Sequence, residues 1–331
     1  MSASTFHVGR TAVYDLAELA TTSPADREVF PFPSPTAVPK ELVHRASADQ
    51  VLLTDWQRLD DAHFSVTAQW PRNHSFFTPV AGGYYDPLIC AETIRQIGNL
   101  LGHAEFAVPF GHNFVLWDLS VTVHPEHLLI GRTPAVIDLD ITCVETKRRG
   151  GRLSGMVYET VARRDGHIVA TGRTSFTCTS PAVYRRIRPE RALRPEHRAL
   201  PLTAPTAPQG VGRLSPTDVV LSPIGEANRW QLRIDTSHPV LFDHPVDHVP
   251  GMVLMEAARQ AAAAALGRRS FMPLGISSEF KRYVELDVPC VIEAERVYED
   301  APGAEEVVRV TGYQEGELTY SAIVRASSYS C

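Results

Sequence analysis

The chain has 331 residues, 44% of them hydrophobic, and a formal net charge of −6 at pH 7. This length favours two domains with packed cores rather than disorder, and the negative charge argues against a general nucleic-acid binder. The five cysteines are irregularly spaced, which argues against a disulfide framework and favours a reducing cytoplasm. We find no signal-peptide pattern and no apolar run long enough for a membrane span, so we expect a cytoplasmic protein with no membrane contact.

The first half of the chain predicts two strands, one helix and then three longer strands. Asp86-Pro87 is a typical helix start, with Asp as the N-cap and Pro at the first helical position. Apolar residues then recur at helical spacing up to Leu101. Glycine-containing turns separate the later strands. The expected strands are 50–53, 64–70, 135–146, 152–163 and 167–179.

The second half repeats this order of elements. Its helix opens at Pro250-Gly251 and is so rich in Ala, Leu and Met that we expect burial on most sides. One central helix followed by an antiparallel meander, present twice, predicts an α+β fold of two tandem hot-dog domains that form an intrachain pseudo-dimer. The expected strands are 219–222, 230–234, 290–298, 305–313 and 317–326.

Four polar positions of the first half recur in the second half at one constant spacing, which indicates a duplication. A Pro- and Arg-rich stretch at 185–216 lacks apolar periodicity and is interpreted as a linker. The predicted domains are therefore 1–184, with a core of about 45–180, and 217–331. The recurring pairs are His74 and His238, Glu92 and Glu256, Arg95 and Arg259, and Gln96 and Gln260.

Glu256, Arg259 and Gln260 are spaced i, i+3 and i+4, so they share one face of the most apolar helix of their half. The plain interpretation is an ion pair on a solvated helix face. Because charged residues are rarely buried without a use, and because the same set recurs at Glu92, Arg95 and Gln96, we favour an active-site face between the two central helices.

The second helix start has a further possible use. The first N–H groups of a helix lack internal partners and can stabilise an oxyanion on a thioester carbonyl, and Gly251 would allow close approach. An ordinary helix start is the alternative. In the first half the Asp86 side chain would compete for these donors, so oxyanion stabilisation fits the second half better.

The loop Phe242–His248 is rich in His and Asp, but its prolines exclude a regular helix and leave only a weak metal signal. We therefore expect no metal and no cofactor. His244 is predicted to contact substrate, with a loop tied by local hydrogen bonds as the alternative. His74 and His238 are open to either a structural or a substrate-binding role.

The string from His238 to Gln260, HPVLFDHPVDHVPGMVLMEAARQ, closely resembles the second repeat of the A-factor biosynthesis family, the γ-butyrolactone synthases of antibiotic-producing actinobacteria. The string from His74 to His103 is similar to the first repeat, and the likeness spans about residues 40–330. The second string is also similar to β-hydroxyacyl thioester dehydratases, but their His-Phe-Pro pattern does not align in register, which argues against simple dehydration.

The resemblance implies an acyltransferase. A β-ketoacyl group would pass from acyl carrier protein to a hydroxyl of dihydroxyacetone phosphate, giving an ester that can close to a butenolide phosphate. Such products lead to γ-butyrolactone, butenolide or furan signals that control antibiotic production. The resemblance also implies that Glu92, Glu256 and Arg259 are required.

These residue types suit acyl transfer. A carboxylate in an apolar groove would have a raised pKa suited to proton transfer, so we expect Glu256 to act as the base. Arg259 would bind the phosphate or the carbonyl, and Glu92 would complete the catalytic set from the other repeat. The expected substrate-binding residues are Arg95, Gln96, Gln260, His74, His238, His244 and Gly251.

Other functions are open from the sequence. A thioesterase or dehydratase acting on acyl thioesters is one alternative, and a non-catalytic acyl- or butyrolactone-binding protein is another. The binder is disfavoured because it would not need two Glu/Arg pairs and because we find no basic recognition helix. One repeat could also be catalytic and the other structural. The expected partners are acyl carrier protein and dihydroxyacetone phosphate, without nucleic acid or membrane, in a monomeric pseudo-dimer or a homodimer.

Overall fold

The computed structural model describes residues 37–80, 82–189, 199–297 and 305–327. Within these ranges twelve strands form one antiparallel sheet in the order β1-β2-β4-β5-β6-β3-β9-β12-β11-β10-β8-β7. The first repeat contributes β1 (Leu53–Arg58), β2 (His63–Trp70), β3 (Asn113–Val123), β4 (Ala135–Arg149), β5 (Arg152–Arg164) and β6 (His167–Thr179). The second contributes β7 (Leu221–Pro223), β8 (Arg229–Leu232), β9 (Pro273–Phe280), β10 (Val291–Val297), β11 (Glu306–Gln314) and β12 (Glu317–Ala326).

The two halves of this sheet have the same strand order. Read from each outer edge inward, the first repeat runs 1-2-4-5-6-3 and the second runs 7-8-10-11-12-9. The two inner strands pair with each other, with Leu119 opposite Ser278 and Val121 opposite Ile276. This shared edge joins the repeats into one continuous sheet, which confirms the predicted tandem pseudo-dimer.

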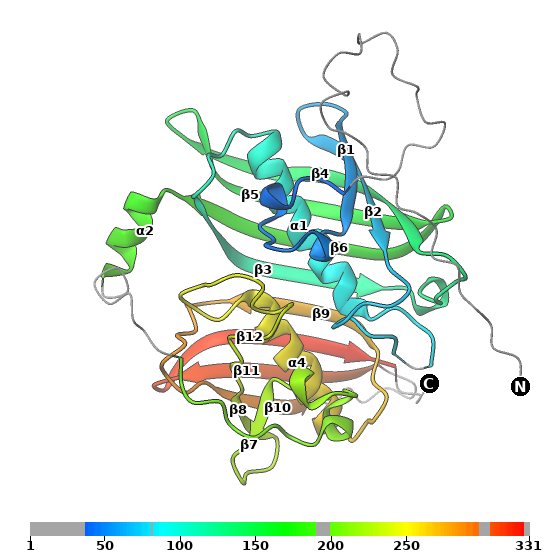
Figure 1. Ribbon diagram of the computed structural model, residues 1–331, viewed down its shortest axis with the longest axis vertical. Coiled ribbons are helices and arrows are strands. Elements are labelled where there is room, and N and C mark those ends of the chain that lie inside the picture. The colour runs from blue at the N-terminus through cyan, green and yellow to red at the C-terminus, as the bar shows by residue number, and fades with distance from the viewer. Residues whose placement is uncertain (1–36, 81, 190–198, 298–304, 328–331) are drawn as a thin grey trace, which may run out of the picture. The chain divides into compact units, whose positions relative to one another are not determined.

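One long helix lies against each half of the sheet (Figure 1). Helix α1 (Pro87–Ala104) begins as predicted, because the Asp86 side chain accepts a hydrogen bond from the N–H of Leu88 at 2.9 Å. Helix α4 (Gly251–Ala265) has Pro250 at its N-cap and no side-chain cap. Neither these helices nor any other in the described ranges is long and apolar enough to cross a membrane.

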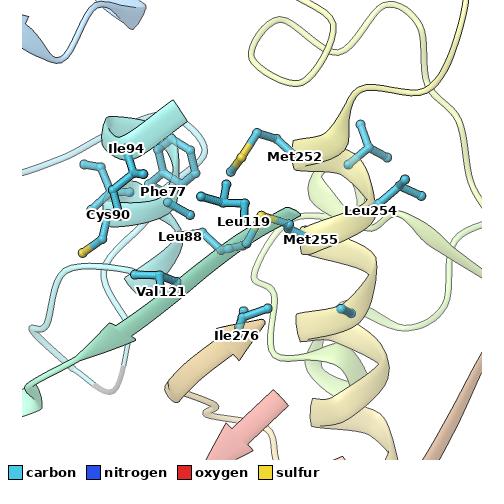
Figure 2. Close-up of a cluster of buried hydrophobic side chains, with 14 of the residues drawn as sticks. Phe77, Leu88, Cys90, Ile94, Leu119, Val121, Met252, Leu254, Met255 and Ile276 are labelled. Carbon is cyan, nitrogen blue, oxygen red and sulfur yellow. The ribbon is translucent and has the colours of Figure 1, made fainter. Parts of the chain in front are cut away.

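Apolar side chains fill the space where the repeats meet (Figure 2). They come from both helices and from the two paired inner strands, so the core is continuous across the duplication. Burying each such side chain contributes about 1.5–3 kcal/mol, which makes separation of the repeats costly. The labelled members include Leu88, Ile94, Leu119, Val121, Met255 and Ile276.

Short 3-10 helices extend the repeat beyond its predicted bounds. Helix η3 (Lys40–Val43) has its counterpart in η6 (Pro208–Val211), at nearly the same spacing as the recurring polar residues. Helix η6 therefore lies inside the stretch interpreted as a linker, and so does the end of α2 (Pro181–Ile187). The start of the second repeat lies closer to 208 than to 217, while positions 190–198 of that stretch and 1–36 of the predicted first domain lie outside the described residues.

Candidate active site

Glu256 is the centre of a buried ion cluster in the second repeat. Arg213 contacts both carboxylate oxygens, through Nε at 2.8 Å and Nη2 at 2.7 Å, and Arg259 contacts both at 3.0 and 2.6 Å. Gln260 donates a further hydrogen bond at 2.5 Å. Burial alone would raise the pKa of Glu256, but Arg213 and Arg259 outweigh it and lower that pKa to about 2.

Glu92 has the same surroundings in the first repeat. Arg95 donates to its two oxygens at 2.8 Å each, Arg45 lies 2.5 Å from Oε1, and Gln96 donates at 2.7 Å. Here too burial would raise the pKa, and the two arginines lower it to about 2. The pKa rise expected for a carboxylate in an apolar groove is therefore wrong for both residues, because each carboxylate is enclosed with two cations.

The two glutamines connect each helix to a neighbouring backbone segment. In each repeat the amide accepts from one backbone N–H and donates to one backbone carbonyl, at 2.8–3.0 Å. All of these groups are buried. This arrangement satisfies the amides and fixes the helices in position. The partners are Leu52 and Gln50 for Gln96, and Val220 and Asp218 for Gln260.

His74 and His238 hold two equivalent turns. His74 Nδ1 accepts from the backbone N–H groups of Phe76 and Phe77, at 3.1 and 3.2 Å. His238 Nδ1 does the same with Val240 and the following residue, at 3.2 and 3.0 Å. Both histidines are buried, and these contacts support a structural role for them.

These turns are contacted by arginines of the opposite repeat. Arg45 donates to the carbonyl of Val240 at 3.0 Å, and Arg213 donates to the carbonyl of Phe76 at 2.9 Å. Each arginine thus links the carboxylate of its own repeat to the turn of the other one. The geometry of each cluster depends on both halves of the chain.

A cavity of about 720 Å³ lies between the repeats. Aromatic and aliphatic side chains of β3, β6 and β9 form much of its wall, which suits an acyl chain. Neither carboxylate of the two clusters lines it. The polar residues that reach it include His44, Arg45, Arg95, Asn99, Asp243 and His244.

The start of α4 also lines this cavity, through Pro250, Gly251 and Met252. Its first N–H groups have no side-chain cap, so they can receive a developing negative charge. The equivalent start of α1 is not available to a ligand, because the Asp86 side chain accepts from the Leu88 N–H. Oδ2 of Asp86 lies 3.5 Å from Arg213 Nη1. Burial raises the pKa of Asp86 despite the nearby arginines.

The two helix arginines differ in access. Arg95 is 21% exposed, lines the cavity and uses Nε and Nη2 for Glu92. Within the described ranges its Nη1 makes no hydrogen bond, so one donor is available to a ligand. Arg259 is fully buried, and its Nη1 points to the carbonyl of Gly212 at 3.4 Å. The structure thus places Arg95, Gly251 and His244 around the cavity, and Glu256 and Arg259 away from it.

The A-factor biosynthesis hotdog domain (AfsA) matches residues 27–180 and 196–330. The chain is 53% identical over 289 residues to the 2-oxo-3-(phosphooxy)propyl 3-oxoalkanoate synthase of Streptomyces virginiae, covering 87% of this chain and 97% of that one. The chain belongs to the A-factor biosynthesis hotdog family. The synthase of the same name from Streptomyces coelicolor is 41% identical, over 88% of this chain and 92% of its own.

The fold of this family member is also found in solved structures. A structure described as an oleoyl thioesterase of Lactobacillus plantarum superposes with a TM-score of 0.51 at 10% identity. The match covers 82% of this chain and 98% of that one. The likeness shows the tandem hot-dog fold.

Sequence reasoning missed two arginines that complete the carboxylate clusters of this A-factor family member. Arg45 and Arg213 are slightly farther apart in the sequence than the recurring helix residues are, so a search at one fixed distance passes over them. Allowing a short gap between the two segments would have found the pair. Asp243 was also missed as the partner of His244, whose Nδ1 lies 2.6 Å from its Oδ1.

Proposed function

We propose that this protein transfers a 3-oxoacyl group from a thioester to the hydroxyl of dihydroxyacetone phosphate, forming a 2-oxo-3-(phosphooxy)propyl 3-oxoalkanoate. The names of its relatives point to this reaction. The observation that carries it is that one cavity is lined both by the uncapped start of α4 and by Arg95, which has a free donor. The product is a precursor for γ-butyrolactone, butenolide or furan signals.

The donor would bind with its acyl chain along the apolar wall and its thioester carbonyl at Gly251. Backbone N–H groups at a helix start stabilise the oxyanion of a tetrahedral intermediate without reorganisation, and loss of one such donor costs about 10²–10³ in kcat. We propose acyl carrier protein as the carrier of this donor.

The acceptor would bind through its phosphate. Arg95 is held by two hydrogen bonds to Glu92, so its guanidinium is oriented before the ligand arrives. His244, held by Asp243, is 44% exposed and lies on the same cavity, where it would contact the phosphate or the carbonyl. Arg95 takes the ligand role in this proposal, because Arg259 has no access to the cavity.

Glu92 and Glu256 act as positioning residues in this scheme. Each carboxylate is saturated by three side-chain donors and does not line the cavity, so neither has a free lone pair within reach of the acceptor hydroxyl. Gln96 and Gln260 hold the helices in register, while His74 and His238 hold the two turns. The base expected at Glu256 thus has no support in the geometry.

Mass spectrometry of the purified protein with a 3-oxoacyl thioester, with and without dihydroxyacetone phosphate, tests the proposal. A phosphorylated ester or butenolide that forms only with the triose phosphate supports it. Free acid formed regardless of the triose would indicate a thioesterase. An unchanged thioester would favour the binding-protein alternative. Running donors on acyl carrier protein and on coenzyme A in parallel tests the proposed carrier.

A further inference from the structure

Two histidines form a pair at the cavity that neither the family comparison nor the repeat pattern assigns. His44 follows η3 and lines the cavity, and His103 lies in the last turn of α1. Their Nε2 atoms are 2.7 Å apart. His103 Nδ1 in turn lies 2.6 Å from the carbonyl of Val108. Three groups are therefore connected in a row that ends at the cavity.

The hydrogen positions in this row follow from its last member. A carbonyl oxygen only accepts, so His103 Nδ1 carries a proton. Burial lowers the pKa of His103 although the bond to Val108 opposes this, so the ring is neutral and its Nε2 accepts. His44 must then donate from Nε2. Burial, followed by His103, Arg95 and His244, lowers the pKa of His44 to about 3, so its Nδ1 is left as a bare lone pair.

That lone pair has no protein partner within the described ranges. His44 packs edge-on against Phe114, with ring centroids 5.0 Å apart, which fixes the plane of the ring. Its Nδ1 is therefore an oriented acceptor on a residue that lines the same cavity as Arg95.

The second repeat lacks both histidines. The position equivalent to His44, directly before the matching arginine, is Gly212, and the register of the two helices pairs His103 with Gly267. His44 and Gly212 share the same left-handed backbone conformation, with φ of 54° and 68°. Glycine is the ordinary residue for that conformation, and a histidine there is strained. The first repeat thus keeps a strained histidine at the cavity where its duplicate has the unstrained residue.

We propose that His44 is the general base of the acyl transfer and that His103 is the positioning residue that sets its tautomer. This inference rests on the proposed function. His44 Nδ1 takes the proton of the acceptor hydroxyl as its oxygen bonds to the thioester carbon. The C–S bond then breaks, and the proton passes to the leaving thiolate. A thioester and an alcohol become an ester and a thiol, with no other reactant.

The positive charge formed in this step can be shared. When His44 gains a proton at Nδ1, its Nε2 proton can move to His103 Nε2, which leaves an imidazolium bonded to Val108. Burial is the main reason that His44 is neutral in the free protein, and the charge of Arg95 adds to it. A phosphate dianion bound at Arg95 would act in the opposite direction and favour the protonated ring. His244 also lines the cavity, but water competes for its free nitrogen because its side chain is 44% exposed.

His44→Gly is the decisive variant, because it installs the residue that the second repeat uses and removes backbone strain. We expect a 10²–10⁴-fold loss of kcat, the range of general-base catalysis, with an acceptor KM within about threefold. Tm should change by only about 4 °C or less, because relief of the backbone strain opposes the loss of the bond to His103. Added imidazole should restore part of the rate. His63→Gln is the matched control, because His63 pairs with Asp60 on the surface, and it should leave the rate unchanged.

His103→Asn keeps a donor for Val108 and removes the partner of His44 Nε2. We expect nitrogen NMR of the wild type to show His44 with a protonated Nε2 and a bare Nδ1, and the variant to show both tautomers with a lower kcat. A wild-type kcat in His44→Gly would overturn the assignment, and a simultaneous loss of kcat in His244→Gln would move the base to His244. A protonated Nδ1 in the free wild-type protein would also overturn the assignment, a measurement that stands even if the triose phosphate proves to be the wrong acceptor.

Discussion

Glu256→Gln separates a structural from a catalytic role for the carboxylate of the second repeat. The substitution leaves Arg213 and Arg259 charged and 0–2% exposed, with their shared anion removed. Loss of one partner of a buried ion pair costs about 3–5 kcal/mol. Asp86, whose Oδ2 is 3.5 Å from Arg213 Nη1, compensates in part, so we expect the lower end of that range. At about 2 °C per kcal/mol for a chain of this size, Tm should fall by about 6–8 °C.

Glu92→Gln is the matched substitution in the first repeat. Its cations are less enclosed, because Arg95 is 21% exposed and can be hydrated, and Arg45 keeps Asp243 at 3.4 Å. We expect a smaller loss of stability, about 1–3 kcal/mol. Arg95 loses the partner that orients it, so the acceptor KM should rise by roughly tenfold or more, as expected for a charge-assisted contact of at least about 1.4 kcal/mol.

Thermal unfolding and steady-state kinetics on both variants decide between these roles. Below its Tm, Glu256→Gln should retain kcat within a few-fold, whereas Glu92→Gln should show the higher acceptor KM. The reasoning is refuted if Glu256→Gln abolishes turnover with a Tm close to that of the wild type, because that result would make Glu256 the proton acceptor despite its burial.

Three further outcomes follow from the same contacts. Arg45→Met should raise the acceptor KM, whereas Arg213→Met should lower Tm with the acceptor KM unchanged, as kinetics and calorimetry would show. The same acceptor KM in both variants would contradict the placement of the acceptor in the first repeat. Gly98→Ala places a Cβ 2.9 Å from the Tyr158 hydroxyl, which should cost about 1–3 kcal/mol and shift the preference in a thioester chain-length series toward shorter donors; an unchanged preference would place the acyl chain elsewhere. Stability should fall as pH drops from about 6.5 toward 3, because the unfolded chain binds a proton that folded His44 does not. Urea unfolding at pH 7 and 5 should show a smaller loss of unfolding free energy between the two pH values for His44→Gly than for the wild type. The pH dependence that is left in the variant comes from His74 and His103, whose pKa values burial also lowers.

The two long helices and the meander strands could be predicted because their signals are local, whereas the edge strand predicted at 50–53 lies at Leu53–Arg58. Asp86 at an N-cap and Pro87 at the first helical position identify the start of α1 from neighbouring residues alone. The meander strands 135–146 and 317–326 follow from turn residues and β-branched runs, and β4 and β12 confirm them.

The strands that join the repeats were not predicted. Strand β9 has the sequence PLGISSEF, with Pro, Gly and two Ser, which have low strand propensity. It is a strand because β3 and β12 flank it on both sides and supply its hydrogen bonds. The cavity depends on this junction, so its location could not follow from either repeat read alone.

The two long helices carry the same polar set at equivalent positions, yet its access to the cavity differs for reasons outside the helices. Gly212 has no side chain next to Arg259, so Arg259 Nη1 can approach and donate to the Gly212 carbonyl. That donor is then not available to a ligand. In the first repeat His44 takes the position of that glycine, and Arg95 retains a free donor. The helix sequences are nearly equivalent, whereas the segments that precede them decide which arginine a ligand can reach.

In the proposed scheme the duplication produces one composite site instead of two equal ones. The oxyanion donors require a helix start without a side-chain cap, which α4 has and α1 lacks because of Asp86. The arginine proposed to bind the phosphate must reach the cavity, which Arg95 of α1 does and Arg259 of α4 does not. In this scheme each repeat supplies a function that the other lacks, and a chain reduced to either repeat would hold half of the proposed site. Both clusters thus have a use in the scheme, because Arg45 and Arg95 beside Glu92 line the cavity while Glu256 fixes the helix whose first residues line it.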